Sequence, residues 1–323
     1  MADSCPSRRH SSAAIYADRV AIITHQQVQI GEIELHVAQC GEGEPVLLLH
    51  GFPELWYSWR HQMQAIADSG RRAIAPDLRG FGGSSAPEAV EAYDIEALTG
   101  DLAALLGALE IGQAVVVGHD WGSDLAWKFA LLQPQLVSAV VGISVPYVPR
   151  APAKPTSLME EYIGEDFYIV WIQEPGVADA ALSADVRRTL ATREVWNAEW
   201  AARHDEPPTP PWMSEEDLQL YVDEFTRTGF TGGLNWYRNL DRSWAYLAQF
   251  EGRTIDQPAL FITGSRDPVR AFMPHEAMAG SVTDLRDVVV IEGAGHWVQQ
   301  EQPDEVNEAL LDFLDKIDTT LTR

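Results

Sequence analysis

The stretch that most constrains this chain is residues 114–122, a short apolar run followed by a turn with two glycines. The run is rich in β-branched residues, which predicts a buried strand. Gly118 and Gly122 bracket Asp120, and the residues after the turn continue with a helical pattern. Glycine suits both positions, because a Cβ there would collide with nearby backbone. The stretch therefore predicts a strand, a tight turn and a helix, with Asp120 pushed into a cleft.

This strand–turn–helix unit matches the context of the G-x-S-x-G nucleophile elbow, with aspartate where serine usually stands. Asp120 is then a carboxylate nucleophile, and the competing interpretation is that it only caps the following helix. Ser123 lies a turn too late to be the nucleophile, which disfavours a serine esterase. An ester formed on a carboxylate must be cleaved by water, and a histidine oriented by a second carboxylate activates water near neutral pH.

Two later residues fit these partner roles, in the order nucleophile, acid, histidine that the elbow context predicts. His296 follows Gly293 and Gly295, after the last expected strand and before the last helix, whereas His204 and His275 lack this placement. Asp267 lies in a tight turn after the expected strand 258–263, and its alternative role is to cap that loop. The carboxyl ends of parallel strands meet at one edge of a sheet, so we expect these groups to converge.

The oxyanion of the ester-cleaving step needs backbone N–H donors. Trp121, directly after the nucleophile, supplies one, and Phe52, in the loop after the strand 46–49, supplies the other. Pro53 has no N–H and favours an extended conformation at Phe52. His50 precedes this loop, and structural support of the loop is its better interpretation.

Strands alternate with helices along the chain, which predicts a doubly wound, mostly parallel α/β sheet. The segment 27–37 alternates around a glycine and predicts a hairpin. Asp94 is the expected N-cap of a helix that ends near residue 110. Between residues 146 and 250 no strand-like run stands out, and helical patterns dominate. We expect a lead-in at 1–23, an α/β core at 24–145 and 251–323, and a helical insertion at 146–250.

The net charge of −25 makes nucleic acid and anionic membrane surfaces poor partners. The two cysteines, Cys5 and Cys40, do not form a disulfide framework. Arg8 and Arg9 could begin a twin-arginine signal, but charged residues break the apolar stretch that should follow. We therefore expect a cytoplasmic protein. Phosphate-binding and dinucleotide-binding glycine motifs are missing from the sequence.

Several motifs resemble segments of the soluble epoxide hydrolases, and the resemblance runs from about residue 33 to 314. It is closest to the single-domain bacterial members. It implies an α/β-hydrolase fold with an eight-stranded sheet and a helical cap formed by the insertion. The segments that carry the resemblance are HGFPELWYSWRHQ at 50–62, DLRGFGGSS at 77–85, GHDWG at 118–122, QEPGVA at 173–178 and LNWYRN at 234–239.

In that family two cap tyrosines bind and protonate the epoxide oxygen, and the matching positions are Tyr168 and Tyr237. Tyr162 is the rival of Tyr168, and helical spacing alone would let Tyr237 merely pack within its helix. Two phenols would stabilise the charge that develops on the oxygen during ring opening. With Trp121 they would bind the substrate, which we expect to be a small apolar epoxide converted by water to a vicinal diol.

The resemblance implies no metal and no organic cofactor. The leading alternative is a haloalkane dehalogenase, which uses the same aspartate and histidine and in which the Trp121 indole would bind halide. A ligand receptor on the same fold is the non-enzymatic alternative. The sequence leaves the physiological epoxide and the oligomeric state open, a homodimer included.

Overall fold

A computed structural model describes residues 21–192 and 196–321, with side chains as far as residue 317. Most of the expected lead-in, residues 1–20, lies outside the described residues. Eight strands form one sheet in the order β1-β2-β4-β3-β5-β6-β7-β8. The strands are β1 (Thr24–Ile30), β2 (Ile33–Cys40), β3 (Pro45–Leu49), β4 (Arg72–Pro76), β5 (Ala114–His119), β6 (Val137–Ile143), β7 (Ala259–Gly264) and β8 (Leu285–Ile291).

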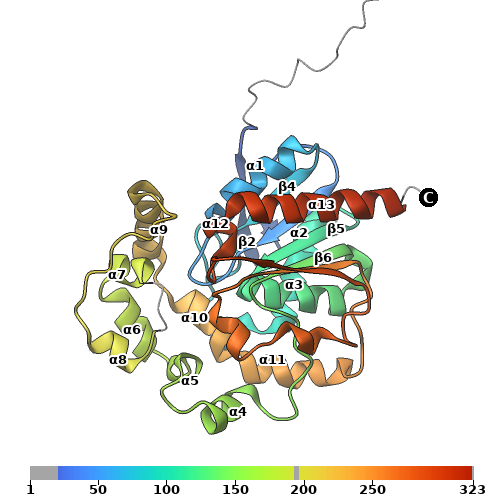
Figure 1. Ribbon diagram of the computed structural model, residues 1–323. Coiled ribbons are helices and arrows are strands. Elements are labelled where there is room, and N and C mark those ends of the chain that lie inside the picture. The colour runs from blue at the N-terminus through green and yellow to red at the C-terminus, as the bar shows by residue number, and fades with distance from the viewer. Residues whose placement is uncertain (1–20, 193–195, 322–323) are drawn as a thin grey trace, which may run out of the picture.

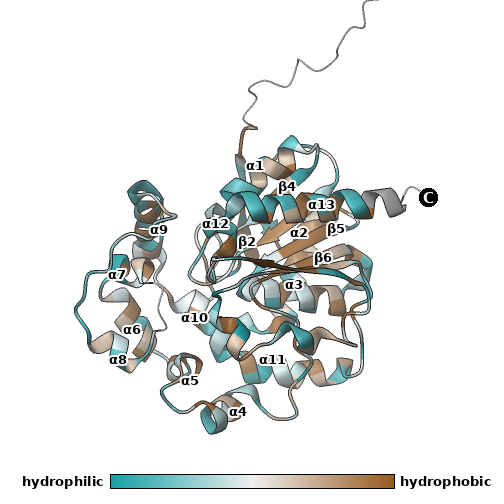
Figure 2. Ribbon diagram, viewed as in Figure 1, coloured by the Kyte–Doolittle hydropathy of each residue, from teal (hydrophilic) through white to brown (hydrophobic). Residues whose placement is uncertain are grey.

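Only β2 runs against its neighbours, because it pairs antiparallel with β1 in the expected hairpin and with β4. From β4 to β8 every pairing is parallel. The strands β3 and β5 are almost wholly buried, as an apolar run on a doubly covered parallel sheet should be. Figure 2 shows these central strands as the apolar interior of the molecule. The prediction of a mostly parallel α/β sheet is confirmed.

Helices cover both faces of the sheet (Figure 1). On one face α1 (Arg60–Asp68), α12 (Val298–Glu301) and α13 (Pro303–Leu321) pack over one core cluster. On the other face α2 (Ile95–Ala108) and α3 (Trp121–Leu132) pack over a second cluster. The α2 helix begins as predicted, because the Asp94 carboxylate accepts a hydrogen bond from Ala97 N at 3.0 Å.

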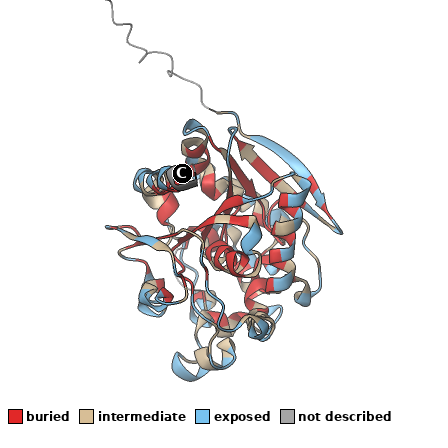
Figure 3. Cartoon of the chain, turned by 90° about the vertical axis from the view of Figure 1, so that its right-hand side faces the viewer, coloured by how far each residue is buried: buried red, intermediate tan, exposed pale blue. Residues whose placement is uncertain are grey.

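The chain between β6 and β7 forms a helical insertion, and its described residues include no strand. Figure 3 shows the inner strands of the sheet as buried and exposed residues on the outer sides of the surrounding helices. This insertion consists of α4 (Pro155–Tyr162), α5 (Tyr168–Ile172), α6 (Val177–Ser183), α7 (Val186–Ala191), α8 (Ala198–Ala202), α9 (Glu215–Thr228), α10 (Thr231–Arg238) and α11 (Leu240–Tyr246).

Hydrogen bonds from side chains tie this insertion to the core. The Tyr57 hydroxyl beside α1 donates to Asp217 of α9 at 2.7 Å, and burial and this hydrogen bond raise the pKa of Tyr57 to about 12. The Trp236 indole of α10 donates to Arg79 O at 3.1 Å. The Asn239 amide donates to Val90 O at 2.6 Å. The insertion therefore sits on the core at both α9 and α10, above the carboxyl edge of the sheet.

Two helix boundaries are not marked in the sequence. A 3₁₀ turn, Trp56–Trp59, precedes α1, which starts at Arg60. The last helix continues to Leu321. Neither boundary carries a cap residue that the sequence could reveal, because no side chain caps η1 or α1 and α13 runs on to the end of the described chain. Within the described residues no helix is both long and apolar enough to cross a membrane.

Candidate active site

Asp120 occupies a strained turn between β5 and α3. Its φ of 53° and ψ of −119° are unusual for a residue with a side chain, and such strain often marks a functional site. A Cβ on Gly118 would lie 2.0 Å from Gly122 O, and a Cβ on Gly122 would lie 2.0 Å from Leu49 O. The turn can therefore form only with glycine at both positions, as the sequence predicts. The Asp120 side chain makes no hydrogen bond that caps α3.

His296 lies between the two carboxylates that the sequence predicts as its partners. Its Nε2 is 3.4 Å from Asp120 Oδ2, and its Nδ1 is 3.1 Å from each carboxylate oxygen of Asp267. Asp267 follows β7 and His296 follows β8, so the parallel strands bring both to one edge of the sheet. Asp267 also caps its own loop by accepting a hydrogen bond from Val269 N at 2.9 Å. The same carboxylate thus contacts His296 and caps its own loop.

Charge pairing sets the protonation of this triad. Burial alone would lower the pKa of His296, but the charges and hydrogen bonds of Asp267 and Asp120 hold it well above its usual value. Burial alone would raise the pKa of Asp267, but the charge and hydrogen bond of His296 keep it below its usual value. The His296 imidazole is therefore a strong proton acceptor as long as both carboxylates are ionised.

The loop after β3 supplies a backbone donor to the nucleophile. Phe52 N donates to Asp120 Oδ1 at 2.9 Å, and the Phe52–Pro53 peptide is cis. His50 is fully buried and accepts a hydrogen bond from Leu78 N at 3.0 Å, in agreement with its expected structural role. Trp121 begins α3, where backbone N–H groups lack helical partners and are free for a ligand. The Ser123 hydroxyl donates to Val145 O at 2.6 Å inside the core, so it is not presented as a nucleophile.

Two tyrosines of the insertion face the nucleophile. The rings of Tyr168 and Tyr237 are 5.9 Å apart, and Tyr237 packs edge-on against Trp121 at 4.8 Å. Burial and the Asp120 charge raise the pKa of both phenols, well above 10 for Tyr237, although a hydrogen bond with the Trp121 side chain opposes the shift there. Both therefore stay protonated at neutral pH. Tyr162, by contrast, is 76% exposed.

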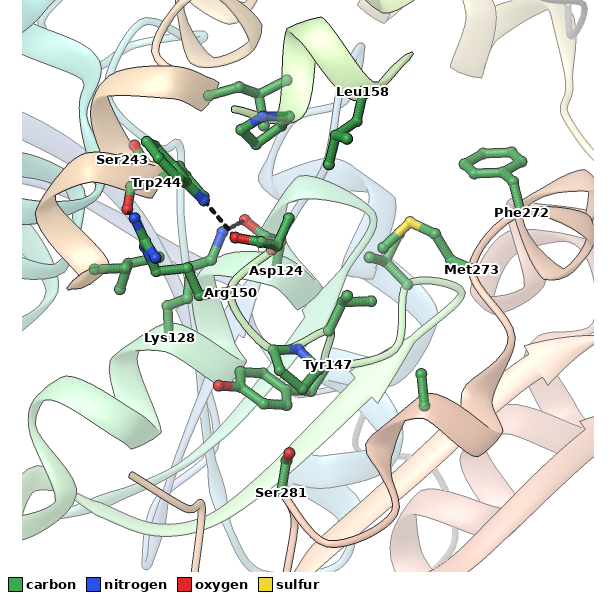
Figure 4. A pocket seen from close by; sticks show the side chains of 18 of the residues that line it. Asp124, Lys128, Tyr147, Arg150, Leu158, Ser243, Trp244, Phe272, Met273 and Ser281 are labelled. Atoms are coloured by element: carbon green, nitrogen blue, oxygen red, sulfur yellow. Dashed lines mark hydrogen bonds and ion pairs between the residues drawn. The ribbon is translucent and has the colours of Figure 1, made fainter. Parts of the chain in front are cut away.

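These groups line one cavity of about 830 Å³ between the core and the insertion. Asp120, Trp121 and both tyrosines contribute to its wall, and apolar side chains provide most of the rest. Figure 4 shows part of this wall, with Tyr147, Leu158, Phe272 and Met273 pointing inward from three separate segments. A volume of this size suits a small organic molecule whose polar contacts come from a few fixed groups.

The structure shows a buried pair, Glu54 and His119, to which the sequence motifs assign no role. His119, the last residue of β5, has its Nδ1 2.8 Å from Glu54 Oε2 and its Nε2 2.8 Å from His296 O. Ser144 also donates to His296 O, at 2.7 Å. The Glu54–His119 pair and Ser144 thereby fix the backbone of the His296 loop. Only position in the sequence could have singled out these two residues, because His119 ends β5 and Glu54 lies in the loop after β3.

Among residues 21–192 and 196–321, no group of three or more His, Cys, Asp or Glu side chains is arranged to hold a metal ion. The acidic groups of the site pair with His296 instead. The fold and the site together are those of an α/β hydrolase.

Comparisons with known proteins agree with this class. The family model of the alpha/beta hydrolase fold matches residues 44–303. Epoxide hydrolase A of Mycobacterium tuberculosis is 47% identical over 312 residues, covering 90% of this chain and 97% of that protein. Epoxide hydrolase 1 of Siraitia grosvenorii is 39% identical over 313 residues, covering 90% of this chain and 98% of the relative.

A crystal structure of epoxide hydrolase A from Mycobacterium thermoresistibile superposes with a TM-score of 0.86 at 47% identity, over 91% of this chain and 98% of that one. The chain belongs to the α/β-hydrolase fold family and, within it, to the epoxide hydrolases.

Proposed function

We propose that this enzyme converts an epoxide to a vicinal diol in two steps, through an ester on Asp120. One observation carries the proposal: Asp120 contacts a backbone donor and a histidine–aspartate pair on its core side, and it shares one cavity with two protonated phenols on its cap side. We also propose residues 146–250 as the cap, since both phenols belong to this insertion.

In the first step the Asp120 carboxylate attacks an epoxide carbon, and the ring C–O bond breaks. The electron pair of that bond goes to the oxygen, which takes a proton from Tyr168 or Tyr237. Hydrogen bonds to this oxygen strengthen as its charge grows, so the phenols stabilise the transition state more than the substrate. Because burial raises the pKa of both phenols, both keep their protons and remain hydrogen-bond donors until the ring opens.

In the second step His296 removes a proton from water, and the hydroxide attacks the Asp120 carbonyl carbon. The amides of Phe52 and Trp121 hold the oxyanion that forms. Its collapse breaks the ester C–O bond, and the diol oxygen takes the proton from His296. Asp120, freed as the carboxylic acid, gives its proton to the phenolate left by the first step, which restores both the carboxylate and the tyrosine. Ester formation removes the charge of Asp120, one of the influences that raise the pKa of His296. The pKa therefore falls once the ester is present, which favours the neutral imidazole that acts as the base.

A single-turnover reaction in heavy-oxygen water tests this route. With enzyme in excess over one simple epoxide, the label should enter the Asp120 carboxylate and not the diol. Peptide mass spectrometry of the segment that contains Asp120 reads the first, and mass spectrometry of the product reads the second. Label found directly in the diol after one turnover would overturn the covalent mechanism. Asp120→Asn is expected to abolish diol formation, because an amide is a poor nucleophile.

The haloalkane alternative would need indole donors aimed at a halide. The Trp121 side chain is hydrogen-bonded with Tyr237, and the Trp236 indole donates to Arg79 O. Both indoles are therefore already engaged, which favours an epoxide as substrate. A haloalkane assayed beside an epoxide separates the two functions, and diol formation excludes a mere ligand receptor.

We keep two proposals from the sequence, a cytoplasmic location and assembly as a homodimer. Cell fractionation tests the first, and light scattering on the purified protein tests the second.

A further inference from the structure

The two cap tyrosines lie on separate short helices. Tyr168 is the first residue of α5, which has five residues, and Tyr237 lies near the end of α10, which has eight. Helices this short are not stable alone in water, so their orientation depends on tertiary contacts. The Tyr168 hydroxyl makes no hydrogen bond within the described part of the chain. The contacts that hold α5 against α10 therefore decide where this hydroxyl lies.

Tyr237 is the better fixed of the two tyrosines, because the core holds it. Its ring packs against Phe52 at 5.7 Å and against Trp121 at 4.8 Å, and its hydroxyl is hydrogen-bonded with the Trp121 side chain. The aromatic neighbours of Tyr168 among the described residues are Phe167 and Tyr237, and both belong to the insertion. The position of Tyr168 therefore has to be set from within the insertion.

Gln173, directly after α5, bridges the backbones of the two helices. Its side-chain Nε2 donates to Ile169 O at 2.8 Å and to Tyr237 O at 3.1 Å. A side-chain amide nitrogen has two N–H groups, so it can donate both hydrogen bonds at once. Both partners are carbonyl oxygens, which only accept, so the nitrogen of the amide must face them. One amide thus ties the residue next to Tyr168 to the backbone of Tyr237.

Arg238, directly after Tyr237, makes a second tie between the same helices. Its Nε donates to Ile172 O of α5 at 3.1 Å, and its guanidinium pairs with Asp179 of α6. Burial alone would raise the pKa of Asp179, but hydrogen bonds from Arg238 and Thr231 hold it below its usual value. The pair is therefore ionised at neutral pH. With these ties α5, α6 and α10 pack against one another as one unit (Figure 1).

We propose that Gln173 and Arg238 are positioning residues, which hold Tyr168 at the distance from Tyr237 that lets one epoxide oxygen accept a hydrogen bond from each phenol. This inference rests on the proposed epoxide hydrolysis and adds the residues that align its two proton donors. Two O–H donors about 2.7 Å from one oxygen, roughly 110° apart, have their own oxygens about 4.4 Å from each other. A displacement of about 1 Å is enough to leave only one phenol on the epoxide oxygen.

Gln173→Met tests the bridge, because it removes both donors and keeps an uncharged side chain of similar length. With enzyme in excess over one simple epoxide, ester formation should slow by about tenfold, since a donor is displaced but not removed. Ester cleavage should keep its rate. Arg238→Lys keeps the charge beside Asp179 but loses the planar guanidinium, and it should slow the same step by a smaller factor. Slowing of both steps to the same extent would refute the positioning role.

A double-mutant cycle with Tyr168→Phe separates positioning from a general structural effect. If Gln173 acts by placing the Tyr168 hydroxyl, its loss has little left to change once that hydroxyl is gone. In the Tyr168→Phe background Gln173→Met should therefore slow ester formation by less than about twofold. A repeat of the full tenfold loss in that background would show that Gln173 acts independently of Tyr168, and would overturn the proposal.

The matched control is Gln257→Met. The Gln257 Nε2 also faces two backbone carbonyl oxygens, Ala130 O at 3.0 Å and Pro134 O at 3.5 Å, but it precedes β7 at the opposite edge of the sheet from Asp120. This variant should keep both rates. Equal rates of ester formation in Gln173→Met and Gln257→Met would overturn the positioning role and leave the proposed function standing. Absence of diol from the wild type would instead refute the proposed function.

Discussion

Removing one phenol tests whether the cap tyrosines act in ester formation while the core residues act in ester cleavage. In Tyr237→Phe the ring stays against Trp121 and Phe52, and only the hydroxyl is lost. The Tyr237 side chain is buried and stays protonated, so its proton is available to an oxygen that becomes charged as the ring opens. Removing one preorganised donor of this kind costs about 10²-fold or more in rate, equivalent to about 2.7 kcal/mol. Because Tyr168 remains, we expect the lower end, about 10²-fold.

The loss should appear in ester formation and not in ester cleavage, since the second step uses His296 and backbone amides. Stopped-flow fluorescence can separate the steps, because Trp121 packs against Tyr237 and should report ester formation. Tyr162→Phe is the control, because Tyr162 is 76% exposed and should leave both rates unchanged. Equal slowing of both steps by Tyr237→Phe would refute the role of Tyr237 as proton donor. The lost hydrogen bond to Trp121 should cost about 1 kcal/mol of stability.

Three further predictions concern the core. Since the pKa of His296 is raised in the folded protein, the stability that His296 contributes is fully present below pH about 6.5 and is lost as the pH rises through the raised pKa. The free energy of unfolding of His296→Gln should therefore fall less steeply with pH over that window than that of the wild type. His119→Ala leaves the buried Glu54 with only its amide donors and should cost about 1–3 kcal/mol in chemical denaturation, and it should also lower kcat by releasing the loop of His296. Gly118→Ala should prevent folding or displace the elbow, as circular dichroism and activity would show, whereas Gly107→Ala, which meets nothing within 4 Å in α2, should stabilise by up to about 1 kcal/mol.

The sheet and the triad geometry could be predicted because both depend on local patterns. A buried apolar strand, a glycine-bracketed turn and a helix are readable within nine residues, and the parallel order then brings Asp120, Asp267 and His296 to one edge. The Glu54–His119 pair could not be predicted in the same way. Its members are 65 residues apart, and only tertiary packing aims both side chains at the same buried point beneath the nucleophile.

The insertion is harder to predict because its helices are short and their faces depend on what they pack against. Tyr162 and Tyr168 are six residues apart, yet one is exposed and the other faces the nucleophile. Spacing could not choose between them, because the chain turns between the end of α4 and the start of α5. For Tyr237, periodicity favoured packing within its own helix, whereas its ring contacts come from Phe52, Trp121 and Tyr168.

The α3 helix shows how one sequence pattern can have two structural meanings. An aspartate and a lysine four residues apart on a helix ordinarily indicate a solvated face with an ion pair. Here the same stripe begins at Asp120, and the elbow turns that face into the cavity instead of into solvent. Asp124 and Lys128 line the cavity because of their distance from Asp120 along α3, and this argument needs only the elbow and the helical repeat.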